Sequence, residues 1–320
     1  DNNTLVGTNA GTAITTGDNN TAFGYLASRV ITTGSNNVSV GAGGNLGANT
    51  TGASNVAVGY ASLSGNTTAS NNVAVGFNSL GANTTGGDNT ASGYDSLGDN
   101  TTGSFNSGVG YEALARNTTA SNNTAMGYRS LKTNTTGGSN IAIGTAALQA
   151  NTTGSNNIGM GYHALVGQTT GENNVAIGFT AGHDMSTGNS NVSMGTQAGY
   201  ANTTGVNNVA IGRDTLLANT TGNGNTAVGR NAGDSITTGE NNAFLGLRAG
   251  HTFTTGSNNV CVGYEAGGSS TTDNNQLWIA RSSGAVNSAG VWVYGDASGR
   301  CYQGNNSSSW STTSDERIKK

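Results

Sequence analysis

The chain has 320 residues, 12 basic and 16 acidic side chains, a formal net charge of -4 and no proline. Such sparse basic charge excludes an electrostatic surface for nucleic acid. The sequence contains no apolar run of roughly 18 residues that would indicate membrane insertion. Cys261 and Cys301 are the only cysteines, so no disulfide framework is expected. The lack of proline suits a body of strand ladders, because proline removes a backbone donor.

A glycine recurs at a fixed spacing through most of the chain. The spacing is 17 residues, except for 18 between Gly41 and Gly59. We number each coil from this marker glycine as position 0; the markers are Gly7, Gly24, Gly41, Gly59, Gly76, Gly93, Gly110, Gly127, Gly144, Gly161, Gly178, Gly195, Gly212, Gly229, Gly246 and Gly263. A short fixed period is typical of stacked coils. The sequence therefore predicts an all-β solenoid, or β-roll, of about 16 coils of 17 residues over residues 1–273.

Positions 13 to 16 predict the strand of each coil. They read Asn, a branched or Thr residue, a small residue and an apolar residue, as in residues 72–75 (Asn-Val-Ala-Val). Such alternation is typical of a strand whose two faces have different surroundings. We expect the small residue at position 15 to face either a close neighbouring backbone or a tight axis between chains.

The other half of the coil shows an exchange between positions 4 and 7. Where position 4 is Leu, as in Leu114, position 7 is Asn or Gln. Where position 4 is Gly or Ser, position 7 is usually large and apolar, as in Gly182 with Met185 and Gly250 with Phe253. Since protein interiors tolerate neither a void nor a double filling, we predict one core space filled from either position.

Two polar columns follow from the repeat. We predict that the Asn at position 13 forms a structural ladder of side-chain hydrogen bonds up the stack; its members include Asn72, Asn89, Asn106, Asn123, Asn140, Asn157 and Asn174. A Thr doublet occupies positions 8 and 9, and its candidate surface-binding members are Thr67, Thr84, Thr101, Thr118, Thr135 and Thr152. Adjacent residues of an extended chain point to opposite sides, so at most one column per doublet faces outward.

Position 1 is aromatic in many coils, including Tyr94, Tyr111 and Tyr128. This column is a candidate for stacking sugars, whereas packing at a coil corner or a chain interface is favoured. The three histidines are scattered, with no spacing that indicates a metal site, and we predict no metal and no cofactor.

After residue 273 the repeat stops. Residues 277–280 (Leu-Trp-Ile-Ala) and 291–294 (Val-Trp-Val-Tyr) predict two strands separated by a loop. We expect residues 274–313 to form a short β cap and connector that covers the open edge of the last coil.

The repeat carries a family resemblance. Residues 71–76 (Asn-Asn-Val-Ala-Val-Gly) and 173–178 (Asn-Asn-Val-Ala-Ile-Gly) are similar to the head repeats of trimeric autotransporter adhesins, which are β-rolls in homotrimers. The family repeat is usually shorter; the 17-residue form with Asn-Thr-Thr-Gly resembles repeats of bacteriophage tail fibres. Each coil has few apolar residues to offset the entropy cost of ordering its backbone. This shortfall also favours association of chains along their length. We therefore expect a parallel homotrimeric fibre.

Residues 313–320 (Thr-Ser-Asp-Glu-Arg-Ile-Lys-Lys) resemble the start of the intramolecular chaperone domain of phage tail fibres, tailspikes and endosialidases. That resemblance implies a truncated chaperone domain at residues 314–320 and a self-cleavage dyad of Ser314 and Lys319. A Ser nucleophile needs a base, and a Lys serves only if burial lowers its pKa. We expect no cleavage in this fragment, only in a longer precursor. The alternative is a charged, solvated tail.

Three functions remain open. The first is a structural, receptor-binding segment of a virion tail fibre or spike, which would contact itself and a host cell-surface receptor such as a glycan. The second is a bacterial trimeric adhesin at the cell surface. The third is an ice-binding solenoid that uses the Thr columns. We do not expect an enzyme acting on external substrates.

Overall fold

The computed structural model describes residues 2–268, 271–280, 291–295, 297–298 and 301–303. The described part is all-β, with short strands joined by turns, and it falls into two units, residues 1–190 (unit 1) and 191–320 (unit 2). It contains no helix long and apolar enough to span a membrane. The predicted all-β solenoid is therefore confirmed.

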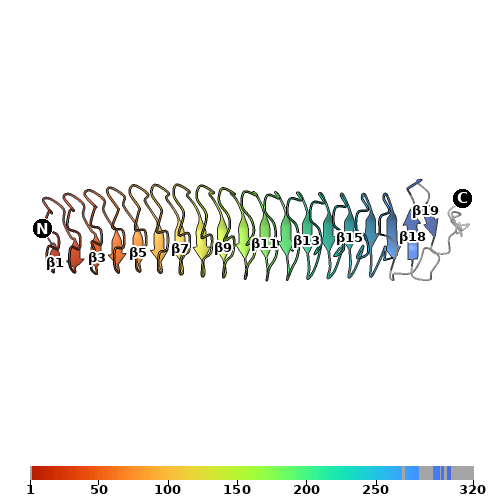
Figure 1. Cartoon of the computed structure of the whole chain (residues 1–320), viewed down its shortest axis with the longest axis horizontal. Coiled ribbons are helices and arrows are strands. Elements are labelled where there is room, and N and C mark those ends of the chain that lie inside the picture. The colour runs from red at the N-terminus through yellow and green to blue at the C-terminus, as the bar shows by residue number, and fades with distance from the viewer. Residues whose placement is uncertain (1, 269–270, 281–290, 296, 299–300, 304–320) are drawn as a thin grey trace, which may run out of the picture. The chain divides into compact units, whose positions relative to one another are not determined.

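Each coil of unit 1 contributes one three-residue strand at positions 14 to 16 (Figure 1). The strands are β1 (Thr4–Val6), β2 (Thr21–Phe23), β3 (Val38–Val40), β4 (Val56–Val58), β5 (Val73–Val75), β6 (Thr90–Ser92), β7 (Ser107–Val109), β8 (Thr124–Met126), β9 (Ile141–Ile143), β10 (Ile158–Met160) and β11 (Val175–Ile177). Neighbouring strands pair in parallel, one repeat apart, as Ala74 pairs with Ala91. The extra residue after Gly41 is absorbed outside the ladder, because Ser39 still pairs with Ala57.

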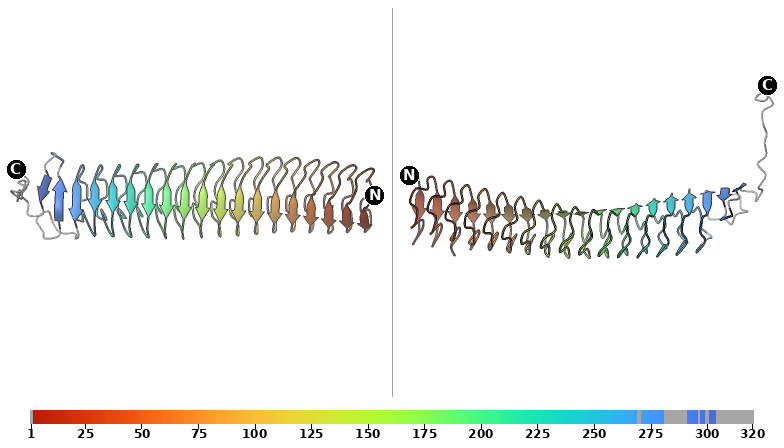
Figure 2. Two further views of the ribbon diagram at one scale, coloured as in Figure 1. Left: turned by 180° about the vertical axis from the view of Figure 1, so that it is seen from behind. Right: turned by 90° about the horizontal axis from the view of Figure 1, so that it is seen from above.

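Unit 2 is built from the same kind of coil as unit 1, but its last strands pair in antiparallel orientation. Its parallel strands are β12 (Val192–Met194), β13 (Val209–Ile211), β14 (Thr226–Val228), β15 (Ala243–Leu245), β16 (Val260–Val262) and β17 (Leu277–Ala280). β18 (Val291–Gly295) and β19 (Cys301–Gln303) then add antiparallel pairs. Both strands predicted after the repeat are present, and β19 was not predicted. Further views show the strands of each unit in one row (Figure 2).

The small residue at position 15 points into the coil. Ala74, Ala142 and their equivalents are fully buried and pack in one cluster with the Leu side chains of position 4. The glycine at this position in β10 shows how close the backbone comes, because a Cβ on Gly159 would lie 3.2 Å from the carbonyl oxygen of Ala164. The expectation of a close neighbouring backbone is therefore right, and the alternative of an axis between chains is wrong.

Position 4 holds the backbone in the left-handed region in every coil. The φ angle is 54° at Leu114 and 51° at Ser28, and glycines such as Gly182 take the same conformation at 60°. Left-handed backbone costs a non-glycine residue about 1–2 kcal/mol. Glycine removes that cost but leaves the core space empty, which explains the exchange with position 7.

The exchange itself is visible in the core. In three coils with glycine at position 4 the large residue at position 7 is buried, namely Met185, Ile236 and Phe253, whereas Ile14 of the first coil is half-buried. Phe244, at position 15 in unit 2, fills the space from a third place, because a Cβ on Gly250 would collide with its ring. The prediction that one core space is filled from position 4 or position 7 is confirmed. It was incomplete, because position 15 can also fill this space.

The glycine at position 0 is required for a different reason. Gly76 has a φ of 139°, and a Cβ there would collide with the carbonyl oxygen of Gly93 in the next coil. The stack therefore admits only glycine at the corner between the strand and position 1.

Candidate self-association surface

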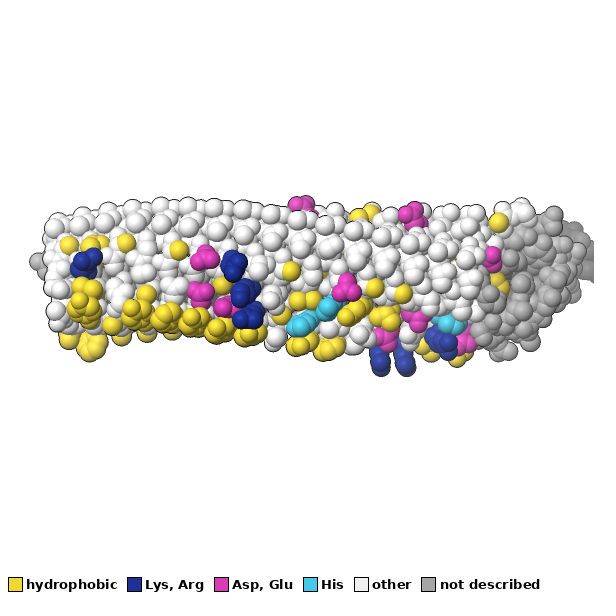
Figure 3. All heavy atoms as spheres, viewed as in Figure 1, with side chains coloured by type: hydrophobic (Ala, Val, Ile, Leu, Met, Phe, Trp, Pro, Cys, Tyr) yellow, Lys and Arg dark blue, Asp and Glu magenta, His cyan; other side chains and the backbone are white. Residues whose placement is uncertain are grey.

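An uncharged apolar surface runs along the strands of unit 1. Because position 15 points inward, its neighbours at positions 14 and 16 point outward, and Val73 and Val75 are 37% and 40% exposed. Together with the aromatic residues of position 1 they form what we call the apolar face, whose exposed members are Val6, Phe23, Tyr25, Tyr60, Val73, Val75, Phe77, Tyr94, Val109, Tyr111, Met126, Tyr128, Ile141, Tyr162, Ile177 and Phe179. Figure 3 shows apolar side chains gathered along the lower edge of this unit.

The aromatic residues of the apolar face stack on one another. Rings in successive coils lie nearly parallel with centroids 5.0 to 5.5 Å apart, in the order Tyr60, Phe77, Tyr94, Tyr111 and Tyr128. The coil spacing of a β-stack, roughly 4.8 Å, sets this distance, because each ring sits one coil from the next. A non-aromatic residue, Thr145, follows Tyr128 at this position, and Tyr162 and Phe179 then form a second, shorter stack at 5.3 Å.

The three tyrosines proposed from the sequence, Tyr94, Tyr111 and Tyr128, all belong to the longer stack. Their ring faces are turned towards each other rather than towards solvent, so a ligand reaches mainly ring edges. Sugars stack on open ring faces, and the geometry therefore favours packing over sugar binding. Tyr94 is nevertheless 46% exposed, which leaves its edge available to a partner.

Charged side chains border the stack at position 2 and nearby positions. The Glu112 carboxylate lies 2.6 Å from Lys132 Nζ and 2.7 Å from Arg129 Nε, and these cations hold its pKa below the usual range, the Lys132 hydrogen bond having the largest effect. The Arg129 guanidinium also lies 4.9 Å from the centre of the Tyr128 ring. Sequence analysis missed this cluster, although Glu112 and Arg129 share a column one coil apart.

The predicted asparagine ladder makes a repeated set of hydrogen bonds. In it, the backbone N–H of Asn106 donates to Oδ1 of Asn89 at 2.9 Å, and its Nδ2 donates to the carbonyl oxygen of Ala120 at 2.9 Å. Equivalent bonds hold all seven predicted members, Asn72, Asn89, Asn106, Asn123, Asn140, Asn157 and Asn174, which are all buried. These side chains satisfy strand and turn backbone inside the coil and are not accessible to a ligand.

A second asparagine column was not predicted. At position 7, Nδ2 of Asn117 donates to Oδ1 of Asn100 at 2.8 Å, and Asn134 donates to Asn117 at 2.9 Å. This direct amide ladder runs from Asn49 to Asn151, where the next coil carries Gln168 instead; the Asn151 Oδ1 has no hydrogen-bond partner in the described part of the chain. The signal was the pairing of Leu at position 4 with Asn at position 7.

The threonines proposed for surface binding are only half exposed. The hydroxyl of Thr84 donates to the carbonyl oxygen of Thr101 at 2.9 Å, and the same bond recurs at Thr67, Thr101, Thr118, Thr135 and Thr152. The second threonine of each doublet, such as Thr85, is the exposed one. The column of these exposed threonines is a single line of hydroxyl groups. An ice crystal plane presents a two-dimensional array, so this geometry does not favour the ice-binding function.

Ser314 and Lys319, the predicted self-cleavage dyad, lie outside the described residues. Their assignment therefore stays a prediction from the resemblance. Cys261 lies at position 15 of a unit 2 coil, where burial raises its pKa to about 12, so its thiol is unreactive near neutral pH.

No protein-family model matches the chain, and no curated protein matches it. Any functional assignment therefore rests on the sequence and the structure alone.

Proposed function

We propose that this chain is a structural fibre segment that associates with identical copies through the apolar face, as a parallel homotrimer. The supporting observation is the length of this face. In most coils of unit 1 an exposed apolar side chain occupies at least one of positions 14, 16 and 1. Thr or Ser takes position 14 in β1, β2, β6, β7 and β8, and no charged residue occupies these three positions in unit 1. Large exposed apolar surfaces usually mark an interface.

The repeat favours a copy of the same chain as the partner. A parallel copy in register meets each apolar coil with an equivalent coil, so that every rung of the face is covered. A partner without the repeat would match only part of the face. Association would also bury the edges of the stacked rings, including Tyr111, and would add apolar burial to a coil that has little of its own.

The resemblance of the repeat, and of residues 313–320, to phage tail proteins favours a virion tail fibre or spike that attaches to a host. In this role the solenoid forms part of the fibre, and a host surface receptor is the further partner. A bacterial trimeric surface adhesin is the alternative with the same assembly. Cleavage by Ser314 and Lys319 would then happen once, in the longer precursor.

The oligomeric mass tests the proposal. We expect light scattering on the full chain to give three times the 31.7 kDa chain mass. Ile141→Glu places a charge in the apolar face at an exposed strand position and should shift the particle towards one chain, because a buried, unpaired carboxylate opposes association.

The matched control is Thr136→Glu, which adds the same charge at an exposed position of the same coil outside the apolar face. Circular dichroism should show the same β content in both variants. A monomeric wild-type chain, or equal masses for the two variants, would refute self-association through this face.

A further inference from the structure

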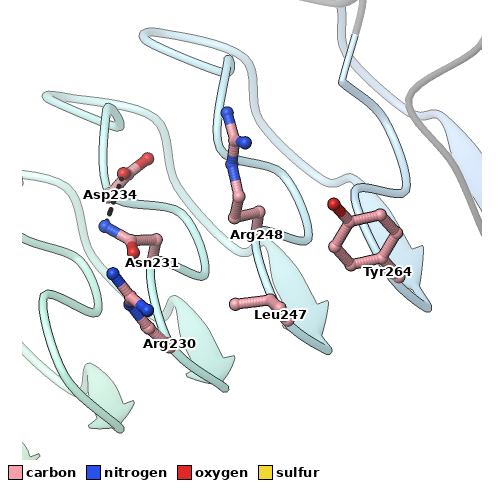
Figure 4. Close-up of a pocket in the computed structure, with 6 residues that line it drawn as sticks. All are labelled: Arg230, Asn231, Asp234, Leu247, Arg248 and Tyr264. Carbon is pink, nitrogen blue, oxygen red and sulfur yellow. Dashed lines mark hydrogen bonds between the residues drawn. The ribbon is translucent and has the colours of Figure 1, made fainter.

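Unit 2 carries a hollow that the apolar face does not use. It has a volume of about 400 Å³ and is lined by side chains from three successive coils: Arg230, Asn231, Asp234, Leu247, Arg248 and Tyr264 (Figure 4). In Figure 4 the labelled residues lie on three successive coils, with Asn231 and Asp234 on the first, Arg248 on the second and Tyr264 on the third. Ligand pockets for small molecules typically start at roughly 300 Å³, so the hollow can hold one sugar ring.

The hollow exists because position 1 changes in unit 2. In unit 1 the aromatic rings of this column fill the space between coils by stacking. In unit 2 the column reads Thr196, Arg213, Arg230, Leu247 and Tyr264. Among the described residues Tyr264 stacks on no other ring, and 48% of it is exposed.

The two guanidinium groups at the hollow have different surroundings. Arg248 is paired with Glu265, at 2.7 Å from Nη1 to Oε1. Arg230 is exposed and forms no ion pair or side-chain hydrogen bond with any residue that the structure describes. An unpaired guanidinium has five donors in a planar fork that matches a carboxylate.

The opposite wall offers hydrogen-bonding groups that are already oriented. The Nδ2 group of Asn231 donates to Oδ2 of Asp234 at 3.0 Å, which fixes both side chains. Burial raises the pKa of Asp234, and its hydrogen bonds only partly oppose that effect. A carboxylate beside an amide accepts and donates to adjacent hydroxyl groups, as a sugar presents them.

We propose that this hollow binds a sugar acid, that is, a sugar ring bearing a carboxylate; for the origin of that sugar, a host surface glycan, this rests on the fibre function above. Arg230 pairs with the carboxylate, Asp234 and Asn231 bind ring hydroxyls, and the exposed side chain of Tyr264 packs on the C–H groups of the ring. Leu247 forms the apolar floor. A neutral sugar lacks the partner for Arg230, and a simple anion lacks the contacts to the other three residues.

The test is a ligand-observed NMR titration of the full chain with sodium glucuronate, with glucose and with inorganic phosphate. We expect glucuronate to bind most tightly. Arg230→Gln and Tyr264→Leu should each weaken glucuronate binding about tenfold, because the first removes the partner of the carboxylate and the second removes the aromatic ring that packs on the sugar. Arg213→Gln is the control, because Arg213 occupies the same column, is paired with Asp214 at 3.0 Å and does not line the hollow.

Each other outcome overturns the assignment. Equal binding of phosphate and glucuronate would show a plain anion site, and equal binding of glucose would show that Arg230 selects nothing. No glucuronate binding, or equal loss in Arg213→Gln, would reject the hollow as the site. Light scattering on the same samples keeps the two proposals apart, because a trimer that does not bind glucuronate refutes only the sugar site.

Discussion

The coils of unit 1 between Leu46 and Leu165 and the coils of unit 2 after Gly229 solve the same backbone problem in opposite ways. Both hold position 4 at positive φ, at 54° for Leu114 and 65° for Gly250. The unit 1 coils accept the strain of a left-handed leucine and gain a filled core. The unit 2 coils use glycine without strain and fill the core from elsewhere.

The choice at position 4 decides what the rest of the coil does. With leucine in the core, position 7 is free for asparagine, and the amide ladder forms. With glycine, Ile236 and Phe253 take position 7 and the ladder is lost. The surface differs in parallel, since the aromatic stack of unit 1 gives way to the hollow of unit 2. The backbone of the coil is thus fixed, whereas the source of its core volume is interchangeable.

The largest effect is expected from converting one kind of coil into the other. Leu165→Gly should destabilise the chain by about 2–4 kcal/mol, because the cavity costs more than the relieved strain returns. Gln168→Met alone should also destabilise, since it overfills a core that still contains Leu165. Together they reproduce the neighbouring coil of Gly182 and Met185, and the double variant should be more stable than the sum of the single effects by at least about 1 kcal/mol.

Urea midpoints of the wild type, the two single variants and the double variant, measured by circular dichroism, complete this double-mutant cycle. Strictly additive losses would show that positions 4 and 7 do not share one core space. The adjacent coil is the natural reference, because Gly182 and Met185 already pack there with Met185 buried.

The second effect concerns the amide ladder. Asn117→Ala should cost about 1–3 kcal/mol, because it removes the partner of both Asn100 and Asn134 inside the core. Asn219→Ala is the matched control in unit 2. The Asn219 side chain makes one hydrogen bond, from Nδ2 to the carbonyl oxygen of Gly222 at 3.1 Å, and its Oδ1 has no partner in the described part of the chain.

Urea midpoints should therefore fall further for Asn117→Ala than for Asn219→Ala. The reverse order would mean that the ladder adds nothing beyond the local turn bonds that both residues make to position 10.

Much of this architecture could be predicted from the sequence. The period identified the coil, the alternation at positions 13 to 16 placed the strand, and the exchange between positions 4 and 7 predicted a shared core space. The direction of Ala74 was left open, because the alternation says that two faces differ and not which face points inward. Which face points inward depends on how the rest of the coil folds back onto the strand, and this is seen only in the structure.

Other features depend on how coils stack. The hollow at Arg230 joins residues from three coils, and the contact of Glu112 with Arg129 and Lys132 joins residues from two. Such pairs become visible in a sequence only after the register is known. The role of Phe244 was also hidden, because a large residue at position 15 breaks the pattern that identified the column.

The smallest effect concerns the charge cluster of unit 1, which has no counterpart with two cations among the described residues of unit 2. The pKa of Glu112 is lowered from its ordinary 4.5, chiefly by the Lys132 hydrogen bond, so the folded chain holds its carboxylate ionised more strongly than the unfolded chain does. This stabilisation is present above pH 4.5 and is lost as the pH falls through the lower folded pKa.

Glu112→Gln should accordingly lower the urea midpoint at pH 7, and the difference from the wild type should shrink as the pH falls below 4.5 and through the lowered pKa of Glu112. Glu172→Gln is the control, because the Glu172 carboxylate is exposed and contacts no basic side chain in the part of the chain that the structure describes. A Glu112→Gln difference that persisted unchanged at low pH would assign the loss to packing of the side chain. In that case the position 2 column would act through shape, as the leucines and glycines of position 4 do.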